Sequence, residues 1–126
     1  MRVLIIEDSD AIVRMISALM SARGFSVRSA SSGARGLDEA VTWKPHAILL
    51  DVYLPGSYDG IEVCAKIRAH HDLKDVPIVM ISATGDEEVK RRAFAAGATA
   101  FYEKPFSPLA LLKEIELVQR RSGIFL

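Results

Sequence analysis

The sequence has little cysteine, no long apolar run and no excess charge of either sign, and each shortage excludes a class of protein. Cys64 is the only cysteine, so no internal disulfide can form, and no cysteine–histidine cluster has the spacing of a zinc site. No apolar run approaches the roughly 18 residues that a membrane span requires. Lys plus Arg and Asp plus Glu number 16 each, so no overall field favours binding to nucleic acid or to an anionic membrane.

The N-terminus and the placement of glycine exclude two further classes. Glu7 and Asp8 come too early for a secretory signal peptide. No glycine-rich loop follows the first apolar run, which argues against nucleotide binding. We expect Cys64 to be a small buried hydrophobe. Together these features predict a soluble protein of the reducing cytoplasm, with no direct contact to nucleic acid or membrane.

The rest of the composition is typical of one globular domain. The chain has 126 residues, of which 50% are hydrophobic and 25% are charged. A chain of this size can build a stable core without disulfides or a structural metal. No repeat, low-complexity stretch or flexible linker interrupts it. We therefore expect a single domain over residues 1–126.

Short apolar runs alternate with longer amphipathic segments along the chain. The runs predict strands over residues 3–6, 25–28, 46–50, 76–81 and 99–102. Between them, apolar residues recur at helical spacing, first at Ile12, Met15, Ile16, Leu19 and Met20. Residues typical of helix ends flank these segments: Gly24, Asp86, Gly97 and Ser107.

This alternation predicts a doubly wound α/β fold. Five strands and five helices in turn imply right-handed crossovers, one five-stranded parallel sheet, and helices on both of its faces. In such sheets, ligands bind beyond the carboxyl ends of the strands. Functional side chains should therefore gather directly after Ile6, Leu50, Ile81 and Tyr102.

Polar side chains do follow these four positions: Glu7 with Asp8, then Asp51, Ser82 and Lys104. Carboxylates held close together repel one another unless a cation lies between them. A few hard oxygen ligands, with room for water and phosphate, suit Mg²⁺ or the similar Mn²⁺. A carboxylate can also act as a nucleophile and form an acyl phosphate. Lys104 would then neutralise charge on the moving oxygens together with the metal, and the Ser82 hydroxyl would donate a hydrogen bond to a phosphoryl oxygen.

Six short motifs stand in a fixed order at the predicted strand ends: Glu7-Asp8, Leu49-Leu50-Asp51, Leu54-Pro55, Asp59-Gly60, Ile81-Ser82-Ala83 and Lys104-Pro105-Phe106. Each is weak alone, but as a set they are highly specific. Over essentially its whole length the sequence resembles bacterial response-regulator receiver domains of the chemotaxis-regulator type. That resemblance implies a flavodoxin-like sheet with strand order 2-1-3-4-5.

The resemblance also implies a role for each site residue. Asp51 would be the phosphoacceptor. Glu7, Asp8, Asp51 and the backbone carbonyl of Tyr53 would hold Mg²⁺ directly or through water. Lys104 would bind the phosphoryl group and would precede Pro105 through a cis peptide bond.

A switch and its partners follow from the same resemblance. Ser82 and Phe101 would be the switch residues. They would change the surface formed by the helix after Asp86, the strand at 99–102 and the helix from Pro108. The phosphoryl donor would be a phosphohistidine on a histidine kinase or a histidine phosphotransfer protein. The switched surface would control a partner, a fused or separate output domain, or a homodimer.

Three features depart from the family pattern. The loop from Pro55 to Gly60 has one extra residue. Ser82 replaces the commoner threonine and keeps its hydroxyl. Phe101 replaces the commoner tyrosine and cannot donate a hydrogen bond, so the polar half of an aromatic switch is lost.

Other functions and other roles for single residues are compatible with parts of the sequence. An aspartate-nucleophile phosphohydrolase uses an Asp-x-Asp pair, but Tyr53 stands at the second position. A degenerate receiver that only binds partners would require loss of a site residue, and none is lost. We therefore expect no enzyme activity beyond self-phosphorylation and self-dephosphorylation. Asp8 could instead cap the first helix, and the basic run Lys90-Arg91-Arg92 could be a solvated face or a partner contact.

Overall fold

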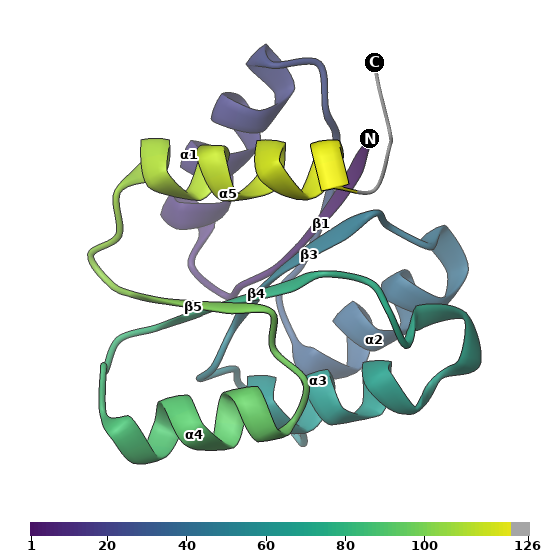
Figure 1. The fold of residues 1–126 in the computed structure, drawn as a ribbon, viewed down its shortest axis with the longest axis vertical. Helices are drawn as coiled ribbons and strands as arrows, with labels where there is room; N and C mark the ends of the chain where they lie inside the picture. Colours follow the sequence, from purple (N-terminus) through teal and green to yellow (C-terminus); the bar gives the residue numbers. More distant parts are fainter. Residues whose placement is uncertain (122–126) are drawn as a thin grey trace.

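The computed structural model describes residues 1–121, in which strands and helices alternate as predicted (Figure 1). The last five residues of the predicted domain, 122–126, lie outside this range. The strands are β1 (Arg2–Ile6), β2 (Ser26–Ala30), β3 (Ala47–Asp51), β4 (Ile78–Ser82) and β5 (Ala100–Glu103). The α-helices are α1 (Asp10–Ala22), α2 (Gly33–Trp43), α3 (Gly60–Ala69), α4 (Glu87–Ala95) and α5 (Pro108–Arg121). A short 3₁₀ helix, η1 (His71–Leu73), precedes β4.

The predicted sheet topology is confirmed. The five strands lie in the order β2-β1-β3-β4-β5, and every neighbouring pair is parallel. Helices α1 and α5 cover one face of the sheet, and α2, α3 and α4 cover the other (Figure 1). Within the described residues, no helix is both long and apolar enough to cross a bilayer.

Alternating side chains of the three central strands build a core on each face of the sheet. Ile5 and Leu49 belong to the core beneath α1 and α5. Their neighbours Leu4 and Leu50 belong to the core beneath α2, α3 and α4. Because both faces are covered, these strands read as continuous apolar runs. Cys64 is fully buried in the second core, and burial raises the pKa of its thiol to about 11, so it behaves as the predicted small hydrophobe.

The prediction for the second strand was wrong by two residues at its C-terminal end. β2 runs to Ala30, where its carbonyl accepts a hydrogen bond from the Glu7 amide at 3.0 Å. As an edge strand it is largely exposed and polar, so the apolar pattern did not mark its end. Asp8 does not cap the first helix. Ser9 is the N-cap of α1, and its hydroxyl accepts a hydrogen bond from the Ile12 amide.

Arg68 holds several loops together at the amino-terminal end of the sheet. Its guanidinium donates to the carbonyls of Leu73, Val76 and Gly97 and to the Thr99 hydroxyl. We expect Arg68→Ala to lower the free energy of unfolding by about 3 kcal/mol, because three carbonyls lose a charged donor. Arg68→Lys should restore only part of the lost free energy of unfolding, because an ammonium cannot replace the several N–H donors of the planar guanidinium.

Urea denaturation measures the effect of the Arg68 substitution. Arg35→Ala is the matched control, because Arg35 is an exposed arginine whose side chain makes no hydrogen bond or ion pair within residues 1–121. It should cost under about 0.5 kcal/mol. Equal losses for the two alanine variants would contradict the role given to Arg68.

His46 joins the starts of β1 and β3. Its Nδ1 accepts from the Arg2 amide at 2.8 Å, and its own amide donates to the Arg2 carbonyl at 2.8 Å. Burial, then the positive charges of Arg2 and the N-terminus, lower the pKa of the imidazole. A neutral acceptor at this place therefore stabilises the fold.

A pH dependence follows from the lowered pKa of His46. Its stabilisation is present above the unfolded pKa, about 6.5, and is lost as the pH falls below it. We expect wild type to lose stability relative to His46→Asn between pH 7.5 and 5.5, because the asparagine carbonyl still accepts but does not titrate. Denaturation curves at the two pH values measure this, and a constant difference would argue against it.

Candidate functional site

Three carboxylates meet at the carboxyl edge of the sheet. Glu7 and Asp8 directly follow β1, and Asp51 is the last residue of β3. Each offers one oxygen that lies within 4.8 Å of those of the other two. Glu7 is 1% exposed and Asp51 is 3% exposed, whereas Asp8 is open to solvent. The three carboxylates therefore lie together, as their positions at the strand ends predicted.

Lys104 brings a positive charge into this cluster. Its backbone amide donates to the Ser82 carbonyl at 2.6 Å, and the predicted cis peptide to Pro105 is present. Its ammonium lies 2.8 Å from Glu7 Oε1 and 3.2 Å from Asp51 Oδ2. Burial alone would lower the pKa of this ammonium, but contact with Glu7 and the charges of Asp51 and Glu7 outweigh it and raise the pKa above its usual value. The stabilisation by Lys104 is therefore lost only at strongly alkaline pH.

The residues present fit a small divalent cation. Three carboxylates against one ammonium leave two negative charges uncompensated. Glu7 Oε1 is buried and makes no hydrogen bond within the described residues, and its polar contact is the Lys104 ion pair. The remaining lone pairs of this oxygen can also bind a cation. The donor set is all oxygen and one member is exposed, which suits Mg²⁺ with several of its waters retained.

Asp51 is fixed from three directions. Its Oδ1 accepts from the Tyr53 amide at 3.2 Å, and its Oδ2 accepts from Lys104. A Cβ placed on Gly60 would lie 1.9 Å from the Asp51 carbonyl oxygen, so the first residue of α3 packs directly on the backbone of Asp51. The sequence marked Gly60 only as part of a motif. The ring of Tyr53 is 52% exposed, and its carbonyl as a metal ligand stays a prediction.

The two predicted switch residues lie at different distances from the carboxylates along their strands. Ser82 ends β4, is fully buried, and accepts at its hydroxyl from the Thr84 amide at 3.2 Å. Phe101 lies further back in β5, opposite Met80, and is partly buried against the core beneath α4. Ser82 therefore belongs to the same sheet edge as Asp51, whereas Phe101 faces a helix.

The model of the response regulator receiver domain matches residues 3–116 of this chain. The chain belongs to this family. It is a receiver of two-component signal transduction, a signalling domain in a phosphorelay rather than an ordinary enzyme. The resemblance inferred from the motifs is thereby confirmed.

Relatives and solved structures agree with this assignment. The alkaline phosphatase synthesis transcriptional regulatory protein PhoP of Bacillus subtilis is 36% identical over 123 residues, which cover 98% of this chain and 50% of PhoP. The DNA-binding dual master transcriptional regulator RpaA of Synechocystis is 34% identical over 121 residues, covering 96% and 50%. The receiver therefore spans about half the length of these relatives. The chemotaxis protein CheY4 of Vibrio cholerae has a TM-score of 0.86 at 32% identity, covering 93% of this chain and 97% of that one.

An apolar pocket of about 530 Å³ adjoins the receiver site. Its lining residues come from α1, the segment after β4, the segment after β5 and the start of α5: Ile12, Met15, Ala83, Lys104, Pro105, Phe106 and Pro108. Met15, which recurs at helical spacing with the buried Ile16 and Met20, is 42% exposed and faces this pocket.

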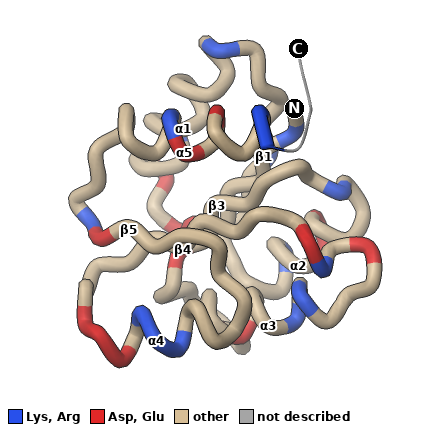
Figure 2. The backbone as a smooth tube through the Cα atoms, viewed as in Figure 1, with Lys and Arg blue, Asp and Glu red and all other residues tan. Residues whose placement is uncertain are grey.

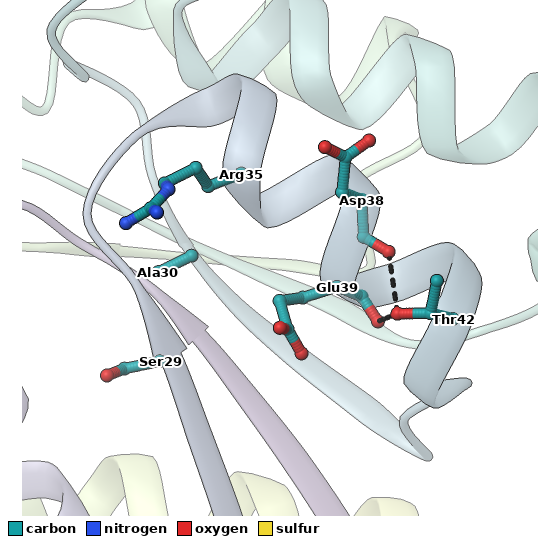
Figure 3. A pocket seen from close by; sticks show the side chains of 6 residues that line it. All are labelled: Ser29, Ala30, Arg35, Asp38, Glu39 and Thr42. Carbon is teal, nitrogen blue, oxygen red and sulfur yellow. Dashed lines mark hydrogen bonds between the residues drawn. The ribbon is translucent and has the colours of Figure 1, made fainter.

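A second cavity, of about 330 Å³, lies between β2 and α2 (Figure 3). Arg35 and Glu39 extend toward the strand there, and Thr42 donates to the carbonyl of Asp38. Glu39 is already paired with Arg28 at 3.2 Å. None of the predicted site residues lines this cavity.

The loop from Pro55 to Gly60 and the basic run Lys90-Arg91-Arg92 both make contacts close by in the sequence. Gly56 adopts a left-handed φ of +93° in an open turn, and the ring of Tyr58 lies 4.7 Å from the Lys66 ammonium of α3. On α4, the acidic first turn precedes the basic run (Figure 2). Lys90 pairs with Glu87 and Arg91 pairs with Glu88, so this run is largely neutralised by its own helix.

Proposed function

We propose that this receiver accepts a phosphoryl group on Asp51 from a phosphohistidine of a histidine kinase or histidine phosphotransfer protein. The supporting observation is the contact of the Asp51 carboxylate with the Lys104 ammonium inside an acidic cluster. A carboxylate oxygen of Asp51 attacks phosphorus and forms the P–O bond while the P–N bond breaks. The departing imidazole keeps the electron pair of that bond and takes a proton.

The residues around Asp51 position and neutralise the transferred group. Lys104, already 3.2 Å from Asp51, stabilises charge on the phosphoryl oxygens, and the Ser82 hydroxyl donates to one of them. Glu7, Asp8, Asp51 and the backbone carbonyl of Tyr53 would hold Mg²⁺ or Mn²⁺. The metal supplies positive charge that offsets the carboxylates and the incoming phosphoryl group.

Phosphorylation then acts as a switch. Ser82 moves toward the phosphoryl group, Phe101 repacks against α4, and the α4-β5-α5 surface shifts between two states. A partner, an output domain or a second copy of the receiver reads that surface. The phosphodonor protein docks at the apolar pocket beside the site. The receiver and these partners act in the cytoplasm.

Hydroxylamine sensitivity tests the chemical nature of the product. After incubation with acetyl phosphate and Mg²⁺, we expect a phosphoryl group that neutral hydroxylamine removes, because acyl phosphates react and phosphoserine does not. Ser82→Ala should still be labelled at a lower rate, and Asp51→Asn should not be labelled. A hydroxylamine-stable product, or labelling that disappears only in Ser82→Ala, would overturn Asp51 as the acceptor.

A further inference from the structure

Strand β5 carries two neighbouring aromatic residues that face opposite sides of the sheet. Phe101 packs against the core beneath α4, where the Lys90 ammonium lies 5.9 Å from its ring centre. Tyr102 packs against the core beneath α5, and its hydroxyl donates to Glu114 Oε1 of α5 at 3.0 Å. The hydroxyl missing at position 101 is thus present one residue later and directed to the other helix.

The far end of β5 is tied to the acceptor. Lys104, two residues after Tyr102, contacts Asp51 through its ammonium and Ser82 through its backbone amide. Within the strand, Glu103 is in register with Ser82. Because strand backbone is extended and has few soft dihedrals, a displacement of Lys104 reaches Tyr102 through only two residues.

The hydrogen bond between Tyr102 and Glu114 joins β5 to α5 directly. The buried side chains of that helix are apolar: Leu111, Leu112, Ile115 and Val118. Apolar packing is not directional, so it allows small rotations that a hydrogen bond opposes. An ion pair of Arg23 with Glu116 also reaches α5, but it is long, at 3.6 Å, and largely exposed, so it contributes little.

Tyr102 and Glu114 are both partly shielded from water. Burial of the phenol, and then the hydrogen bond and charge of Glu114, raise the pKa of Tyr102. The hydroxyl therefore keeps its proton and continues to donate throughout the physiological range. Hydrogen bonds to a charged acceptor in a partly buried place are stronger than exposed neutral ones.

We infer that Tyr102 and Glu114 are positioning residues that couple the end of β5 to α5, and so carry the state of Asp51 to that helix. This coupling rests on the proposed phosphorylation of Asp51. It divides the response of the surface: α4 responds through the packing of Phe101, and α5 responds through a directional hydrogen bond.

Amide NMR shifts before and after addition of beryllium fluoride, a phosphoryl mimic, with Mg²⁺ test the inference. In wild type, amides of both α4 and α5 should shift. Tyr102→Phe removes only the hydroxyl, and we expect it to lose at least half of the α5 shift changes while α4 responds fully. Glu114→Gln keeps an acceptor oxygen and should retain most of the α5 response, whereas Glu114→Ala should not.

A matched control comes from the other face of β5. Lys90→Met removes the cation near Phe101 and should leave the α5 response unchanged. Dispersed amide spectra confirm that each variant is folded. Wild-type α5 shift changes in Tyr102→Phe would overturn the coupling alone. No response of either helix in wild type would overturn the proposed switch and the coupling with it.

Discussion

Replacing Gly60 with alanine is expected to lower the free energy of unfolding by about 3 kcal/mol or more. The added methyl would lie 1.9 Å from the Asp51 carbonyl oxygen and 2.8 Å from the Val52 Cα. These are backbone atoms of a buried strand end, so they cannot move aside as a flexible side chain could. The Gly60 amide also donates to the Val52 carbonyl at 2.7 Å, so moving α3 away would break that bond.

The control for Gly60 is a glycine of the same loop. Gly56 has a φ of +93°, but a Cβ there meets nothing within 4 Å. Gly56→Ala should therefore cost only about 1 kcal/mol of backbone strain. Urea denaturation of the two variants gives the comparison. If Gly60→Ala were no more destabilised than Gly56→Ala, the close packing of α3 on Asp51 would be refuted.

Lys104→Met is expected to change two properties of the site in opposite directions. The rate of phosphorylation by acetyl phosphate should fall by about 100-fold, because one preorganised cation at the phosphoryl oxygens is lost. The affinity for Mg²⁺ should rise by at least about tenfold, because a positive charge 2.8 Å from Glu7 no longer competes for the same carboxylates. A fold that was merely damaged would lose both properties.

Isothermal titration with MgCl₂ and intact mass after timed labelling measure the two effects of Lys104→Met. Lys74→Met, which removes an exposed lysine following η1, should leave both unchanged. Weaker Mg²⁺ binding in Lys104→Met would show that Lys104 supports the metal site instead of competing with it. An unchanged rate of phosphorylation would show that Lys104 takes no part in phosphoryl transfer.

The sequence predicted the fold well because the fold depends on periodicity. Buried strands covered on both faces leave continuous apolar runs, and the runs leading to Ile6, Leu50 and Ile81 are clear. The edge strand β2 was misplaced because an exposed strand leaves no such signal.

The candidate site was predictable to the level of residues but not of contacts. Strand ends in a parallel sheet meet at one edge, which is why Glu7, Asp8 and Asp51 could be grouped from sequence. Residues whose role depends on a distant partner left no local signal. His46 accepts a hydrogen bond from a backbone amide 44 positions away. Tyr102 donates a hydrogen bond from β5 to Glu114 of α5.

Phosphorylation of Asp51 with the help of a divalent cation can be measured by intact mass. The protein and Asp51→Asn are each incubated with acetyl phosphate, with and without Mg²⁺. We expect a gain of one phosphoryl group that requires Mg²⁺ and is absent in the variant. No gain in wild type, under conditions that label a control receiver, would contradict it and leave a domain that keeps the fold without the switch.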